Sequence, residues 1–114
     1  MADDRQDETI LVVDDNLDIR KLAKLFLEHS GHTVVTAADG DEGLRVYEEQ
    51  HANIALLLSD VKMPKMNGLE LAVRVLGMNS QLPVLLMSGV AGCDYGGLEC
   101  VAKPFRPGRV DRGG

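Results

Sequence analysis

The residues with the clearest potential for chemistry are three aspartates that follow runs of apolar residues. Asp14 and Asp15 end the segment Thr9–Asp15 (TILVVDD), and Asp60 ends the segment Ile54–Asp60 (IALLLSD). If these runs are strands of one parallel sheet, their carboxyl ends meet at one edge and bring the carboxylates together. Two carboxylates about 4 Å apart repel each other by roughly 4 kcal/mol at an effective dielectric near 20. Such a cluster requires a cation.

The oxygen-only donor set of this predicted cluster favours a hard divalent cation. With no clustered His or Cys, Mg²⁺ is favoured over zinc, and Mn²⁺ is a further option. A bound Mg²⁺ keeps several waters and accepts phosphate oxygens, so the cluster suits a phosphoryl group, with Asp60 as a candidate nucleophile. Ser88 and Lys103 follow two later apolar segments and would bring a hydroxyl and one ammonium group to the same edge.

These side chains have to be positioned by alternating strands and helices. Continuous apolar runs, as opposed to alternating ones, are typical of strands in a parallel sheet that is covered on both faces. The further strands predicted on this ground are Thr33–Ala37, Pro83–Ser88 and, from a weaker pattern, Glu99–Lys103. Strands that alternate with helices imply right-handed crossovers, so the predicted fold class is α/β with a doubly wound, five-stranded parallel sheet.

Helical patterns lie between the predicted strands. The first helix follows Asn16 and ends at Gly31, which is placed to form a left-handed cap. The second begins at Asp39, which together with Glu42 resembles a capping box, and continues through Tyr47.

The third predicted helix follows Asn67, which with Glu70 repeats the capping pattern. Its expected buried stripe consists of Leu69, Ala72, Val73 and Leu76.

Composition limits the classes to which the chain can belong. Its 114 residues are 45% apolar and 4% aromatic, which suits one domain with an aliphatic core and excludes a disordered chain. The formal net charge of −6 repels a phosphate backbone, so we expect no direct binding to nucleic acid. No apolar run approaches the roughly 20 residues of a membrane-spanning helix, so we expect no membrane association.

The ends of the chain and its cysteines indicate the cellular compartment and the bounds of the domain. The polar, acidic residues 1–8 are expected to be a flexible leader and lack the basic start and apolar stretch of a secretory signal. Cys93 and Cys100 are expected to be reduced thiols of a cytoplasmic protein. The predicted domain spans residues 9–105, followed by a disordered or atypical tail at 106–114.

Taken together, these motifs resemble the receiver domain of two-component response regulators, in the CheY-like superfamily. The resemblance rests on an ordered set of motifs after alternating strands, which is far more specific than any one of them. The set consists of Asp14-Asp15, Asp60–Gly68 (DVKMPKMNG), Ser88-Gly89 and Lys103-Pro104-Phe105.

This resemblance implies a function and a role for each site residue. Asp60 would accept a phosphoryl group from a histidine kinase or phosphotransfer protein, and the domain would switch its partner interactions without being an enzyme. Asp15 would ligate Mg²⁺ directly, Asp14 mainly through water, and Lys62 through its backbone carbonyl. The remaining phosphoryl contacts would come from Ser88 and Lys103. The implied strand order is the flavodoxin-like order 2-1-3-4-5.

The sequence departs from this family in its last third. Lys103 follows Ser88 by only 15 positions, and the glycine-rich stretch between them disfavours a helix, since each interior Gly costs about 1 kcal/mol. The fourth helix is therefore expected to be reduced, and the fifth to be missing after Phe105. Cys100 stands three positions before Lys103, where the family usually has an aromatic switch residue, and Tyr95 is a candidate substitute.

Several alternatives remain open at this level. A sheet face left bare by missing helices would be covered by homodimerisation or by a docked partner. A degenerate receiver could act as a protein-interaction module that does not switch. A small magnesium-dependent phosphatase with an aspartyl nucleophile ranks last, because Asp14-Asp15-Asn16 is not the Asp-x-Asp that this class requires.

Overall fold

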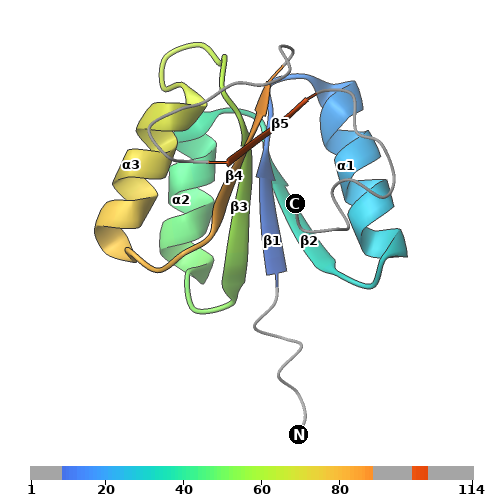
Figure 1. Ribbon diagram of the computed structural model, residues 1–114, viewed down its shortest axis with the longest axis horizontal. Coiled ribbons are helices and arrows are strands. Elements are labelled where there is room, and N and C mark those ends of the chain that lie inside the picture. Colours follow the sequence, from blue (N-terminus) through green and yellow to red (C-terminus); the bar gives the residue numbers. More distant parts are fainter. Residues whose placement is uncertain (1–8, 89–98, 103–114) are drawn as a thin grey trace, which may run out of the picture.

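The computed structural model describes residues 9–88 and 99–102 and places them in a central sheet with helices on both of its faces (Figure 1). The elements follow one another as β1 (Thr9–Val13), α1 (Leu17–His29), β2 (Thr33–Ala37), α2 (Gly40–Gln50), β3 (Ile54–Asp60), α3 (Gly68–Met78), β4 (Val84–Ser88) and β5 (Glu99–Ala102). None of the helices in this described part of the chain has the length and apolar character needed to cross a membrane.

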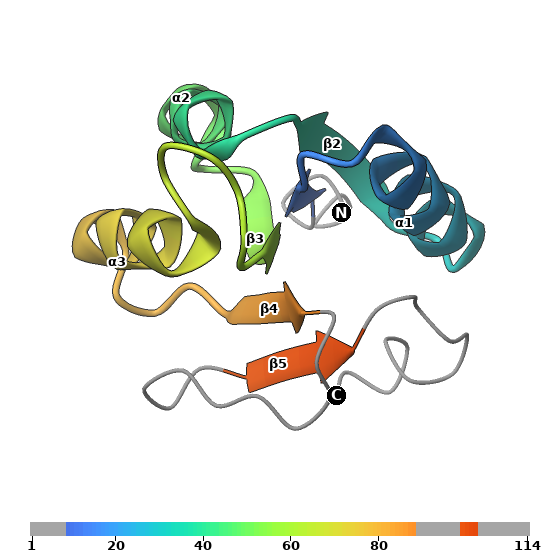
Figure 2. The same ribbon diagram turned by 90° about the horizontal axis from the view of Figure 1, so that it is seen from above.

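All of the strand pairs in the sheet are parallel, in the order β2-β1-β3-β4-β5. The α/β class and the order of the first four strands confirm the expectation from the sequence. The last strand, β5, pairs with β4 at one edge, from Leu85 opposite Glu99 to Ser88 opposite Ala102 (Figure 2). The expected reduced fourth helix and missing fifth helix fall in 89–98 and 103–114, outside the described residues, as does the bare face that depended on them.

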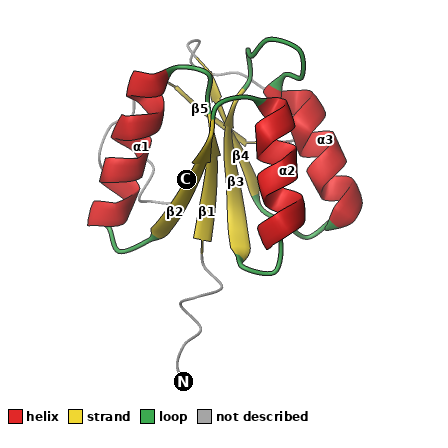
Figure 3. Ribbon diagram, turned by 180° about the vertical axis from the view of Figure 1, so that it is seen from behind, coloured by secondary structure: helices red, strands yellow, loops and turns green. Residues whose placement is uncertain are grey.

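Alternate residues of each central strand face opposite layers of the molecule. In β1, Leu11 and Val13 belong to a core shared with α2 and α3, whereas Ile10 and Val12 belong to a core shared with α1. The helices accordingly divide between the two faces, with α1 on one and α2 and α3 on the other (Figure 3). Because both faces are covered, all five residues of β1 are buried, which explains its continuous apolar run.

The ends of these helices are capped, as the sequence predicted for Asp39, Asn67 and Gly31. The side chains of Asn16, Asp39 and Asn67 accept hydrogen bonds from the first turns of α1, α2 and α3. Gly31 has a φ of 98° at the end of α1, and its N–H donates to the carbonyl of Glu28. With the bond from the N–H of His32 to the carbonyl of Leu27, this forms a Schellman cap.

The buried face of α3 differs from the predicted stripe. Val73 was expected in the core, but 64% of it is exposed, while the fully buried side chains are those of Leu71, Ala72 and Val75. The helix carries apolar residues around most of its circumference, so an i, i+3, i+4 pattern fits more than one face. Packing against α2, β3 and β4 selects the face, and the prediction for Val73 was wrong.

Candidate functional site

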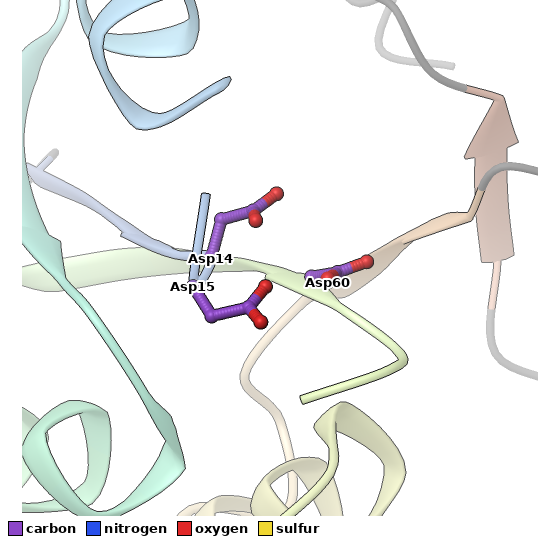
Figure 4. Close-up of side chains that lie close together, drawn as sticks. All are labelled: Asp14, Asp15 and Asp60. Atoms are coloured by element: carbon purple, nitrogen blue, oxygen red, sulfur yellow. The ribbon is translucent and has the colours of Figure 1, made fainter. Parts of the chain in front are cut away.

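Three aspartates meet at the carboxyl edge of the sheet. Asp14 and Asp15 follow β1, Asp60 ends the neighbouring strand β3, and their side chains lie close together (Figure 4). One carboxylate oxygen from each residue lies within 4.8 Å of the others. Asp14 and Asp60 are buried and Asp15 is exposed, so the cluster has two members inside the protein and one that faces the solvent.

Asp14 is held through its backbone as well as its side chain. Its N–H donates to the carbonyl of Ala37 at the end of β2, at a distance of 3.2 Å. Its Oδ1 accepts from the N–H of Asn16 at 2.9 Å, and its carbonyl accepts from Nη1 of Arg20 at 2.8 Å. These contacts attach the β1–α1 loop to both the adjacent strand and the helix that follows.

Close approach of the backbone positions Asp60. A Cβ atom on Gly68, the first residue of α3, would overlap the carbonyl oxygen of Asp60. The same carbonyl accepts from the hydroxyl of Ser59 at 2.9 Å, and the N–H of Gly68 donates to the carbonyl of Val61 at 2.8 Å. The start of α3 is therefore packed directly against the end of β3, and only glycine fits there without displacement.

The loop between β3 and α3 borders the cluster. Val61 is buried, Lys62 is exposed, and Lys65 adopts a φ of 69° that is unusual for a residue with a side chain. An open hollow of about 630 Å³ is lined by Val61, Lys62, Met63, Pro64 and Asn67. The described lining of this hollow belongs to the loop and to the cap of α3, and it does not include Asp60.

The other predicted site residues are placed only in part. Ser88 ends β4, the strand next to β3, so its backbone lies at the same edge as Asp60. Lys62 follows Asp60 by two positions, in the loop after β3. Cys100 lies in β5, where its backbone pairs with that of Leu86 in β4. Lys103 lies outside the described residues, as do Cys93 and Tyr95.

The donor set fits a hard divalent cation. Three carboxylates supply oxygen ligands at one point, and no Cys or His belongs to the cluster within the described part of the chain. Mg²⁺ and Mn²⁺ favour such ligands. Three negative charges at this separation are also mutually repulsive, which a divalent cation would offset.

Two contacts in the site were not anticipated from the sequence. Arg20 is six residues from Asp14, a spacing that corresponds to no regular contact across a loop. The overlap that a side chain at position 68 would cause became visible only with the tertiary structure. The sequence pattern predicts only that Asn67 caps the following helix, and this gives no indication that Gly68 contacts Asp60.

Known proteins share this fold and sequence pattern. The chain is 35% identical to the probable transcriptional regulator ycf27 of Cyanophora paradoxa, over 90% of this chain and 44% of that protein. Its structure matches Vibrio cholerae chemotaxis protein CheY4 with a TM-score of 0.84 and 29% identity, covering 93% of this chain and 94% of that chain. Thermotoga maritima response regulator protein TrrA, in complex with Mg²⁺-BeF, matches with a TM-score of 0.83 and 28% identity, covering 93% and 95%.

A family model for the response regulator receiver domain matches residues 10–112. The chain therefore belongs to the response regulator receiver domain family, as the motif set indicated. Receiver domains are signalling modules of two-component systems and not conventional enzymes. The chain spans less than half the length of the ycf27 relative.

Proposed function

We propose that this chain is a phosphoacceptor receiver in which Asp60 takes a phosphoryl group from a histidine kinase or a phosphotransfer protein. The observation that carries the proposal is the meeting of Asp14, Asp15 and Asp60 within 4.8 Å at the carboxyl edge of the sheet. A nucleophilic carboxylate with two further oxygen ligands beside it suits phosphoryl transfer, since that reaction depends on positioning and charge neutralisation.

In the proposed reaction a carboxylate oxygen of Asp60 attacks the phosphorus of a phosphohistidine. The new P–O bond forms as the P–N bond to the donor imidazole breaks, and the electron pair of that bond stays with the imidazole nitrogen. Hydrolysis later returns the carboxylate and releases inorganic phosphate. The site would be reset without any other covalent change to the protein.

The resident cofactor in this proposal is Mg²⁺, with Mn²⁺ as a substitute. Asp14, Asp15, Asp60 and the backbone carbonyl of Lys62 would hold it, and when bound it would neutralise charge on the transferring group. The support comes from the all-oxygen donor set and from the TrrA relative, whose structure is a complex with Mg²⁺-BeF. Ser88 and Lys103 are proposed to contact the phosphoryl oxygens.

The wider role of the chain belongs to the same proposal. A phosphorylated receiver would act by changing its contacts with partner proteins in the cytoplasm, and a homodimer or a docked partner domain is a candidate for this output. We propose no direct contact with nucleic acid, because the net charge of −6 opposes it. Any transcriptional output would then be carried by another domain or another protein.

One observation favours a second candidate function. Cys100 occupies β5 opposite Leu86, at the position where the family resemblance leads us to expect a large aromatic switch residue. A thiol cannot exchange between buried and exposed positions as a ring does. A receiver that keeps its site but does not switch would then serve as a protein-interaction module.

Intact mass measurement after incubation with acetyl phosphate and Mg²⁺ tests the first candidate. The wild-type chain should gain one phosphoryl group that hydroxylamine removes, and Asp60→Asn should gain none. Asp41→Asn, which changes an exposed aspartate of α2, is the matched control and should be labelled normally. A wild-type chain that binds Mg²⁺ but is never labelled would favour the interaction module.

A further inference from the structure

Arg20 connects the first helix to the acidic edge of the sheet. It lies in the first turn of α1, where its N–H donates to the carbonyl of Asn16 at 3.0 Å. Its half-buried side chain turns back toward β1, and Nη1 donates to the carbonyl oxygen of Asp14 at 2.8 Å. A guanidinium donor makes this bond stronger than one between two neutral groups.

The carbonyl that Arg20 contacts belongs to the peptide between Asp14 and Asp15. A peptide unit is planar, so its oxygen and the two flanking Cα atoms move together. Both carboxylates branch from those two Cα atoms. Holding the oxygen therefore restricts the direction of two of the three acidic side chains at once.

Two further contacts hold Asp14 at other atoms than its carbonyl oxygen. Its N–H is held by Ala37 on β2, and its Oδ1 accepts from the N–H of Asn16. The first contact fixes the entry into the loop and the second fixes one carboxylate. The bond from Arg20 holds the peptide plane that leads into Asp15, which is the exposed member of the cluster.

We infer that Arg20 is a positioning residue, which holds the Asp14–Asp15 peptide so that both carboxylates are preset for a divalent cation. This inference rests on the proposed function. It assigns Arg20 no contact with the cation, with a phosphoryl group or with the nucleophile.

The sign of the effect on Mg²⁺ affinity separates positioning from electrostatics. A positive charge near three carboxylates opposes cation binding, so its removal alone should tighten the binding of Mg²⁺. Loss of an outer contact that orients metal ligands instead weakens metal binding, by about 10-fold to 100-fold in metal sites. For Arg20→Met we therefore expect Mg²⁺ to bind about tenfold more weakly by calorimetry.

Two further variants define the origin of this loss. Arg20→Lys keeps the charge and a donor on a long side chain, so it should recover part of the affinity. Arg45→Met removes an exposed arginine of α2 and has the same change in net charge. It should bind Mg²⁺ as the wild-type chain does, and an equal loss in this control would overturn the inference.

Amide hydrogen exchange tests the same inference without metal. In Arg20→Met the N–H of Asn16, which donates to Asp14, should exchange faster, while the N–H of Leu11 in the buried strand β1 should keep its rate. Unchanged exchange at Asn16, or unchanged or tighter Mg²⁺ binding, would overturn the positioning role. If Asp60 takes up no phosphoryl group but these changes appear, the proposed function fails and the positioning role stands.

Discussion

At the scale of single residues, the three carboxylates of the acidic cluster repel one another when no metal ion is bound. Asp14 and Asp60 are withdrawn from water, at 0% and 6% exposure, while Asp15 remains exposed. Burial weakens solvent screening, so the repulsion at this edge is stronger than it would be on an open surface. We expect this repulsion to lower the stability of the domain without metal, while the same charges attract cations.

Neutralising Asp15 should therefore have opposite effects on stability and on metal binding. Asp15→Asn keeps the size of the side chain and removes one charge from the cluster. We expect its melting temperature in EDTA to rise by roughly 4–8 °C, which corresponds to about 1 kcal/mol. Its affinity for Mg²⁺ should fall by at least about tenfold, or roughly 1.4 kcal/mol.

Calorimetric titration and thermal denaturation measure the two effects of Asp15→Asn. Asp41→Asn on the exposed surface of α2 is the control and should change neither quantity appreciably. If Asp15→Asn lowered the melting temperature without metal, mutual repulsion would not be the dominant interaction at this edge.

At the scale of elements, the site depends on how closely α3 and α2 approach the loop after β3. The first residue of α3, Gly68, lies against the carbonyl of Asp60. The first residue of α2, Gly40, lies against Met66, where an added Cβ would come within 2.6 Å of the backbone oxygen. Two glycines at helix starts thus allow the loop and both helices to pack around the cluster.

A methyl group at position 68 should disrupt this packing. Gly68→Ala forces the start of α3 away from a backbone oxygen that cannot move independently, so we expect a loss of at least about 2 kcal/mol in the free energy of unfolding. Urea denaturation measures the change. The displaced end of β3 should also reduce the rate at which Asp60 is labelled by acetyl phosphate.

The same helix provides the control for this substitution. An added Cβ at Gly77 would meet nothing within 4 Å. Gly77→Ala should therefore stabilise the protein by about 0.5–1 kcal/mol, because alanine favours the helical backbone. A comparable loss of stability in both variants would show that contact with Asp60 is not the cause.

At the scale of the whole molecule, one sheet with helices on both faces carries the site at its carboxyl edge. The two cores meet the sheet from opposite sides, and neither includes the exposed Asp15. We therefore expect a cation bound at the cluster to leave the packing of the two cores unchanged. Its binding free energy should add directly to the stability of the domain.

Addition of Mg²⁺ should accordingly raise the melting temperature. At ten times the dissociation constant, linkage adds about 1.4 kcal/mol, which corresponds to roughly 5–10 °C for a domain of this size. Scanning calorimetry in MgCl₂ and in NaCl of equal ionic strength separates binding from screening of the net charge of −6. Equal shifts in the two salts would contradict a specific cation site.

Local sequence patterns were sufficient for the elements whose residues interact with near neighbours. The strands Thr33–Ala37 and Ile54–Asp60 have the predicted bounds, and Asp39 and Asn67 cap α2 and α3 as expected. Caps and apolar runs depend on residues a few positions apart. The topology rule for parallel sheets then places Asp14, Asp15 and Asp60 at one edge.

Other features were decided by contacts between distant parts of the chain. Packing selected the face of α3 and left Val73 exposed, although its spacing suited a buried stripe. The bond from Arg20 to Asp14 and the approach of Gly68 to Asp60 depend on how a helix is oriented against a strand end. Sequence alone predicted the acidic cluster because residue type determines its chemistry, whereas the orientation of its carboxylates required tertiary structure because it depends on the packing of separate elements.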